Sequence, residues 1–105
     1  NVSPNCFFIF LTNNDSFKKI KNGKKTNYRV NENGESARKV FRLLAEKYDG
    51  AVWDVFGIMG GLGSMKDWEY EGLAKKDKIH FTNKGYALLG DLFFNALMRL
   101  DIERE

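Results

Sequence analysis

The strongest constraint on this chain is the order of three segments: an apolar run, a periodic helical pattern and a second apolar run. Residues 6–11 (Cys-Phe-Phe-Ile-Phe-Leu) contain no polar side chain and end in a polar turn, which predicts a strand buried on both faces. Residues 35–48 place apolar side chains three and four positions apart, as an amphipathic helix does. Residues 51–56 are rich in β-branched and aromatic side chains, which predicts a second strand. A strand, a helix and a strand in this order favour a right-handed crossover between parallel strands.

This order predicts the α/β class, because a parallel sheet needs helices on both faces and therefore forms a three-layer α/β/α arrangement. Thr82 is expected to cap a last helix whose apolar positions run from Tyr86 to Leu100 at the same spacing. Two parallel strands make a poor sheet on their own. We therefore expect residues 1–105, which start at Asn1 without Met, to be the C-terminal portion of a single larger domain. The remaining strands would come from an N-terminal part of that domain or from a dimer partner.

The composition is that of a folded chain, with 43% hydrophobic residues, nine Phe and one Pro among 105 residues. The longest apolar run is far shorter than the roughly 18 residues that a membrane-spanning helix requires, so we expect no membrane span. The single cysteine, Cys6, cannot form an internal disulfide, and its apolar neighbours predict a buried, inert thiol. Cysteine usage therefore leaves the cellular compartment open.

The net charge is +3, and much of the excess lies in five lysines around Asn22-Gly23, namely Lys18, Lys19, Lys21, Lys24 and Lys25. Such a cluster can follow phosphates or another anionic surface. Residues 16–33 are otherwise mostly polar and turn-rich, with the aromatic residue Tyr28 close by. We predict a long solvated loop here, with at most a short helical turn, and no nucleic-acid partner.

His80, the only histidine, follows Asp77 by three residues in a loop that leads into the last predicted helix. A carboxylate at that spacing on a turning backbone can accept a hydrogen bond from the imidazole Nδ1. The Nε2 atom is then free to take a proton from a nucleophile, and the carboxylate stabilises the imidazolium that forms. The bare pattern also fits a surface or capping histidine, so the surrounding sequence must decide.

Around that pair the chain reads Gly72-Leu73-Ala74, then residues 77–82 (Asp-Lys-Ile-His-Phe-Thr), then Gly85-Tyr86 and an amphipathic helix. This block resembles the last block of the SGNH hydrolases, the GDSL-type esterases and lipases. The likeness extends upstream to residues 51–56 and to Met59-Gly60-Gly61, Ser64-Met65 and Trp68. These residues resemble one bacterial branch of that superfamily, which contains carbohydrate acetylesterases and related acylhydrolases. Roughly residues 36–98 are covered.

The resemblance implies a flavodoxin-like α/β/α fold that uses no metal or organic cofactor, with about two of its parallel strands in this chain. It implies that His80 is the general base and Asp77 its orienting acid. The substrate would be an acyl ester, above all an acetyl ester, on carbohydrate. A bacterial periplasmic or secreted protein is compatible with that activity, although the sequence does not fix the compartment.

The nucleophilic serine of these hydrolases lies near their amino terminus in a Gly-Asp-Ser type block, which this chain does not contain. We therefore expect the nucleophile upstream and this chain to be inactive alone. Ser64 lacks the elbow motif of a nucleophile and is interpreted as the cap of a short helix, with Asp67 three residues on. Residues 12–15 (Thr-Asn-Asn-Asp) lack the glycine of the block that supplies an oxyanion-hole asparagine, and we interpret them as a strand end.

The missing nucleophile leaves a second hypothesis from another class, a non-catalytic carbohydrate-binding or assembly module that keeps the hydrolase architecture. For either hypothesis, the candidate substrate contacts are Gly60, Gly61 and Trp68. The two glycines would let a substrate approach the backbone, although a structural turn is the preferred interpretation of them. Trp68, in a predicted loop before the catalytic block, could face a sugar or acyl group, whereas Trp53 in a strand is expected in the core.

Overall fold

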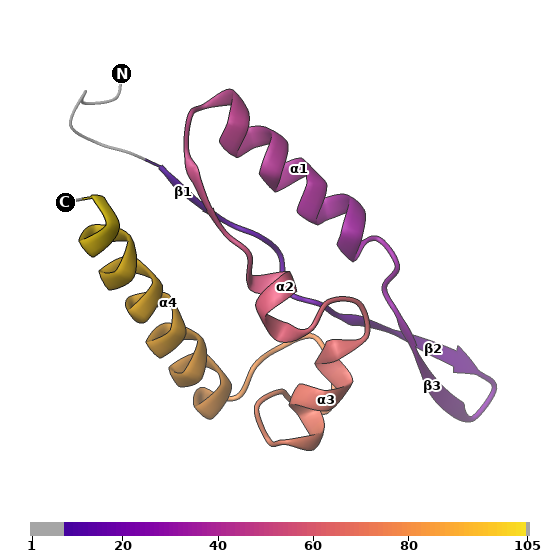
Figure 1. Ribbon diagram of the computed structural model, residues 1–105. Helices are drawn as coiled ribbons and strands as arrows, with labels where there is room; N and C mark the ends of the chain where they lie inside the picture. The colour runs from indigo at the N-terminus through magenta and orange to yellow at the C-terminus, as the bar shows by residue number, and fades with distance from the viewer. Residues whose placement is uncertain (1–7, 105) are drawn as a thin grey trace.

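The computed structural model describes residues 8–104, with side chains described for residues 8–99 (Figure 1). The elements follow in the order β1 (Ile9–Leu11), β2 (Phe17–Asn22), β3 (Lys25–Val30), α1 (Gly34–Lys47), β4 (Ala51–Trp53), α2 (Val55–Met59), α3 (Ser64–Tyr70) and α4 (Asn83–Arg104). Within this part of the chain, no helix is long and apolar enough to cross a membrane.

Strands β1 and β4 form a parallel pair in which Ile9 lies opposite Ala51 and Leu11 opposite Trp53. Helix α1 makes the crossover between them and packs on both strands. Figure 1 shows α1 and α4 on opposite sides of this pair. The ring centroids of Trp53 and Phe93 lie 4.9 Å apart, so β4 packs against α4 through these two side chains. The predicted α/β class, with helices flanking about two parallel strands, is confirmed.

Both parallel strands are shorter than predicted. Cys6 and its expected burial lie outside the described residues, and in β1 the side chain of Leu11 is 44% exposed rather than buried on both faces. Within the described residues β1 and β4 pair only with each other, so no further strand contributes side chains that would cover Leu11. The second strand ends at Trp53 instead of Phe56, because Asp54 accepts a hydrogen bond from the Gly57 amide at 3.1 Å and caps α2.

A β-hairpin replaces the loop predicted for residues 16–33. Strands β2 and β3 pair antiparallel from Phe17 opposite Val30 to Asn22 opposite Lys25. Gly23 opens the two-residue turn with φ +64°, a conformation that suits glycine. The prediction of a loop was wrong because the strands are rich in lysine, a residue with low strand propensity, and nevertheless pair along their whole length.

The buried core gathers around α3, where Met65 and Trp68 pack with Val55, Met59, Ala74 and Phe81. Helix α3 begins differently from the prediction, since Gly63 is its N-cap residue and Ser64 is its first helical residue. The capping oxygen comes from far away in sequence. The fully buried carboxylate of Asp15 accepts a hydrogen bond from the Met65 amide at 2.9 Å, and a carboxylate at this end also suits the helix dipole.

Helix α4 begins as predicted, because the hydroxyl of Thr82 accepts a hydrogen bond from the Gly85 amide at 3.2 Å. Gly85 is held against the backbone carbonyl of Leu73 so closely that a Cβ atom there would clash with it. The start of α4 is thereby packed directly against the segment that precedes Asp77.

Candidate active site

Asp77 and His80 form a hydrogen-bonded pair in the loop before α4. The Nδ1 atom of His80 lies 2.6 Å from Oδ2 of Asp77. The other carboxylate oxygen, Oδ1, accepts hydrogen bonds from the backbone amides of Ile79 at 2.9 Å and His80 at 3.0 Å. One oxygen therefore orients the imidazole while the other fixes the turn that carries it.

The electrostatics of the pair keep the acid ionised. The hydrogen bond from the His80 side chain, followed by those from the His80 and Ile79 amides, lowers the pKa of Asp77 to about 2. The ionised carboxylate of Asp77 can only accept, so Nδ1 is the ring nitrogen that donates to it, and Nε2 is the ring nitrogen left to take a proton.

The imidazole is presented to the surface. The His80 side chain is 63% exposed, and within the described part of the chain Nε2 has no hydrogen-bond partner. The backbone of the loop is nonetheless fixed, because the Lys75 amide donates to the His80 carbonyl at 2.8 Å and the Thr82 amide donates to Leu73 at 3.0 Å. A basic nitrogen on a fixed loop, open to an incoming group, is the geometry that a general base needs.

Segments distant in sequence support the same loop. The side-chain amide of Asn14 donates to the Ile79 carbonyl at 3.2 Å, and the Phe17 amide donates to the Lys78 carbonyl at 3.0 Å. Lys78 has the left-handed φ of +57°, and its ammonium lies 4.2 Å from the centre of the Tyr28 ring and 3.5 Å from Glu69. The sequence analysis did not connect these residues with His80, because only tertiary folding brings them together.

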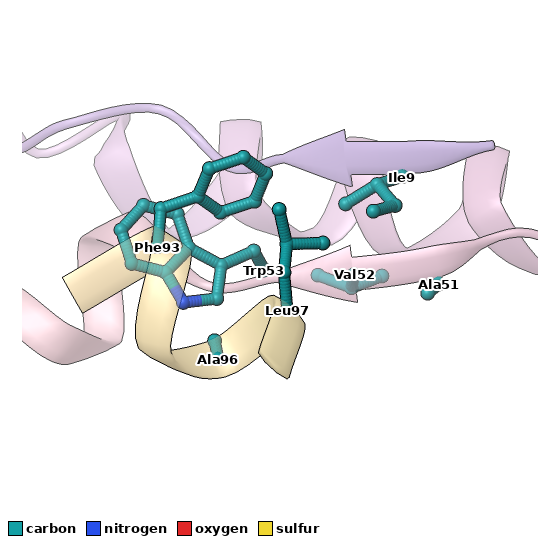
Figure 2. Close-up of a pocket in the computed structure, with 7 residues that line it drawn as sticks. All are labelled: Ile9, Ala51, Val52, Trp53, Phe93, Ala96 and Leu97. Atoms are coloured by element: carbon teal, nitrogen blue, oxygen red, sulfur yellow. The ribbon is translucent and has the colours of Figure 1, made fainter. Parts of the chain in front are cut away.

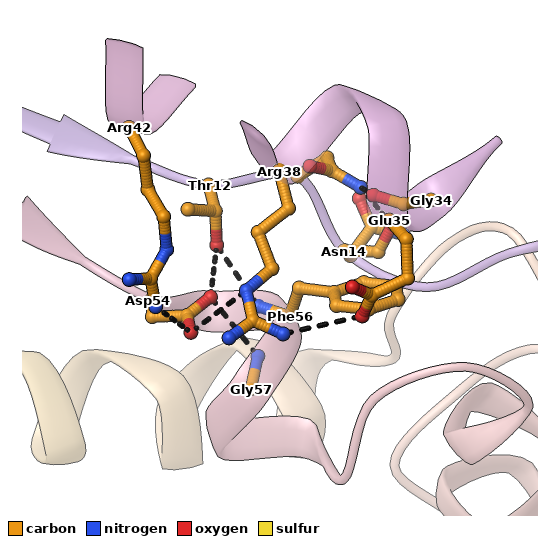
Figure 3. A network of polar contacts seen from close by, with 10 residues as sticks. Thr12, Asn14, Gly34, Glu35, Arg38, Arg42, Asp54, Phe56 and Gly57 are labelled. Carbon is orange, nitrogen blue, oxygen red and sulfur yellow. Dashed lines mark hydrogen bonds and ion pairs between the residues drawn. The ribbon is translucent and has the colours of Figure 1, made fainter. Parts of the chain in front are cut away.

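A second polar network joins the carboxyl ends of β1 and β4 to α1 (Figure 3). The Thr12 hydroxyl donates to Asp54 at 2.9 Å and accepts from the Phe56 amide at 3.0 Å. Arg38 and Arg42 reach the same carboxylate at 3.2 and 3.1 Å. Partial burial alone would raise the pKa of Asp54, but the Gly57 amide, Thr12 and Arg42 outweigh it and lower the pKa. This network holds the carboxyl ends of β1 and β4 to each other and to α1.

The predicted substrate contacts take structural positions. Gly60 and Gly61 have φ angles of +120° and +83°, and the Gly61 amide donates to the Phe56 carbonyl at 2.9 Å, which ends α2. Trp68 lies in α3 rather than in a loop and is only 9% exposed. Its indole N–H donates to the Met59 carbonyl at 3.1 Å, and its ring packs on Phe81 at 5.4 Å. Little of the indole is left for a substrate.

Ser64 is buried, and its hydroxyl has no hydrogen-bond partner among the described residues. A serine nucleophile must lie within hydrogen-bond reach of its base and be open to the substrate. Ser64 is closed off from solvent and makes no hydrogen bond to His80 within the described part of the chain, and it lies in α3 as the first residue of that helix. In residues 8–99, no group of three His, Cys, Asp or Glu side chains is arranged to hold a metal ion.

An apolar hollow of about 150 Å³ lies between the parallel strands and α4. Figure 2 shows Trp53 and Phe93 at one end and Ile9 and Ala51 at the other. Its lining contains no titratable side chain, so it offers packing surface and no acid or base.

Comparison with known proteins gives one informative likeness. No model of a protein family matches the chain, and no curated protein matches it. A solved structure described as "Peptidoglycan O-acetylesterase in action, 5 min" superposes on 92% of this chain with a TM-score of 0.76 and 26% sequence identity. The chain spans 27% of the length of that protein. The likeness shows that this chain shares the fold of part of that protein.

Proposed function

We propose that this chain supplies the general base and its orienting acid to a serine esterase that removes acetyl groups from carbohydrate. The observation that carries the proposal is the Asp77–His80 pair, with Nδ1 held at 2.6 Å and Nε2 exposed. Its support from known proteins is the likeness to a peptidoglycan O-acetylesterase. That likeness makes an O-acetylated cell-wall glycan the first substrate to test.

The reaction follows from the protonation state of the pair. Nε2 of His80 takes the proton of a serine hydroxyl as its oxygen attacks the ester carbonyl. The imidazolium, stabilised by the Asp77 carboxylate, then returns the proton to the sugar oxygen as the bond from that oxygen to the acyl carbon breaks. Water attacks the acyl-serine with His80 again as base, which releases acetate and restores the serine.

The serine is proposed to lie in a segment of the same domain outside residues 1–105. Such a segment would find apolar surface to pack against, because the exposed apolar side chains include Leu11 on β1, Val52 on β4 and Phe94 on α4. Further strands beside β1 and β4 would bury the strand residues and complete the three-layer fold. A dimer partner that completes the sheet is the alternative source.

The test is acetate release by the complete protein from p-nitrophenyl acetate and from O-acetylated peptidoglycan. His80→Ala should lower kcat/KM by about 10⁴-fold or more, and a serine-reactive phosphonate should abolish activity. Asp77→Asn should lower it by a similar order, because the wrong imidazole tautomer is then favoured. Asp91→Asn, the same change on exposed surface of α4, is the matched control and should leave it unchanged.

The absence of a Gly-Asp-Ser block supports one competing function, a carbohydrate-binding or assembly module without catalysis. In that case the complete protein would bind the glycan without releasing acetate. His80→Ala would then leave binding unaltered, and the phosphonate would not label the protein.

A further inference from the structure

The β2–β3 hairpin concentrates positive charge on an arm of the molecule. Residues 17–30 contain six basic side chains and no Asp or Glu, namely Lys18, Lys19, Lys21, Lys24, Lys25 and Arg29. The other 11 basic and 14 acidic residues leave the rest of the chain with a net charge of −3. Among the described residues, none of the six has an acidic partner within 4.0 Å.

The strand register sets two of these charges against each other. Lys18 lies directly opposite Arg29 across the hairpin, an arrangement that destabilises a strand pair. Both side chains line a hollow of about 270 Å³, together with Ile20, Val30, Glu32 and Asn33. The hollow thus has two cationic groups and one carboxylate, and an added anion would relieve the repulsion between the cations.

The hairpin is also fixed to the candidate active site. The Phe17 amide donates to the Lys78 carbonyl at 3.0 Å, and Tyr28 lies against the Lys78 ammonium at 4.2 Å. Lys78 is two residues from His80 in the chain. Tyr28 lies on the other face of the hairpin from Lys18 and Arg29, but Asn33 lines both their hollow and a second hollow that reaches Ile79, the residue before His80. A polymer held in the first hollow would therefore lead toward the loop that carries the base.

We propose that the hollow formed by Lys18 and Arg29 binds a carboxylate of the glycan whose ester is cleaved at His80. This inference rests on the proposed function and names the substrate as an acidic glycan ester. The Arg29 guanidinium offers paired N–H donors that match a carboxylate, and the Lys18 ammonium adds a point charge. Nucleic acid is the less favoured occupant, because neither aromatic ring of the hairpin is open for base stacking: Phe17 packs against the core, and Tyr28 is engaged by Lys78.

The test measures binding to the complete protein carrying His80→Ala, so that no substrate is turned over. The probes are soluble peptidoglycan fragments with free carboxylates and the same fragments with those carboxylates amidated, titrated calorimetrically. The double substitution Lys18→Gln with Arg29→Gln should raise the Kd for the free-carboxylate fragments by roughly three- to tenfold. The Kd for the amidated fragments should stay the same, and 0.5 M NaCl should remove most of the difference.

The matched control is Lys39→Gln with Lys66→Gln, which removes two exposed charges elsewhere and should leave both affinities unchanged. Far-UV circular dichroism confirms folding, and Arg29→Gln alone should give a smaller increase in Kd. Equal losses in the control, or a single-stranded DNA bound more tightly than the glycan, would overturn the inference. If the complete protein is an active esterase but the hairpin substitutions leave the Kd unchanged, this inference alone is refuted. If the substitutions raise the Kd but the complete protein releases no acetate, only the proposed catalysis is refuted.

Discussion

Thr12 offers the sharpest test of how the strand ends are held together. Its side chain is 4% exposed, and its hydroxyl both donates to Asp54 at 2.9 Å and accepts from the Phe56 amide at 3.0 Å. Thr12→Val keeps the shape and removes both hydrogen bonds. The Phe56 amide then becomes a buried donor without a partner, which costs about 1–3 kcal/mol. The lost bond to the charged Asp54 adds about 1–2 kcal/mol, so the expected loss of unfolding free energy is about 2–5 kcal/mol.

Thr12→Ser is the matched control, because it keeps the hydroxyl and removes one methyl group. Its expected cost is about 1 kcal/mol. The assay is urea unfolding of the complete protein monitored by tryptophan fluorescence, since Trp53 is the last residue of β4 and directly precedes Asp54. A valine variant as stable as the serine variant would refute the reasoning, because the two hydrogen bonds would then contribute nothing.

Two further predictions concern packing and pH. Gly34→Ala would place a Cβ 2.6 Å from the ring of the fully buried Phe56, so thermal unfolding should show a loss of about 1–3 kcal/mol. Gly90→Ala, with open space around it in α4, should instead add about 0.5–1 kcal/mol, and equal effects would contradict the packing argument. Because the pKa of Asp77 is lowered from 3.8 to about 2, the stability it adds is present above pH 3.8 and disappears as the pH falls through 2. The difference in Tm between wild type and Asp77→Asn should therefore shrink between pH 4 and 2; a constant difference would argue against the His80 contact.

The sequence predicted those parts of the fold whose signals are local. The helix over residues 35–48 was right to within one residue at each end, because apolar periodicity is a short-range feature. The crossover followed from it. The Asp77–His80 contact was also predictable, because a spacing of three residues on a turn brings the two side chains together without help from the rest of the fold.

The errors arose where tertiary contacts or capping decided the outcome. Asp54 ended the second strand early by capping α2, although Val55 and Phe56 favour β-structure by propensity. Asp15 capped α3 from 50 residues away, a role that the sequence analysis gave to Ser64. The hairpin had one usable signal, Asn22-Gly23 between two segments of similar length, but its lysines concealed the alternation.

The residue that holds the hairpin, Lys78, has an unusual backbone conformation. Lys78 has a φ of +57°, which costs a non-glycine residue about 1 kcal/mol or more, and Lys78 is at once the hairpin's partner and a neighbour of His80. Glycine would relax the backbone at this position but would remove the ammonium that meets Tyr28 and Glu69. Lys78 thus combines a strained backbone with contacts to both the hairpin and α3, and together with Asn14 it is a residue through which the rest of the fold holds the loop of His80 in place.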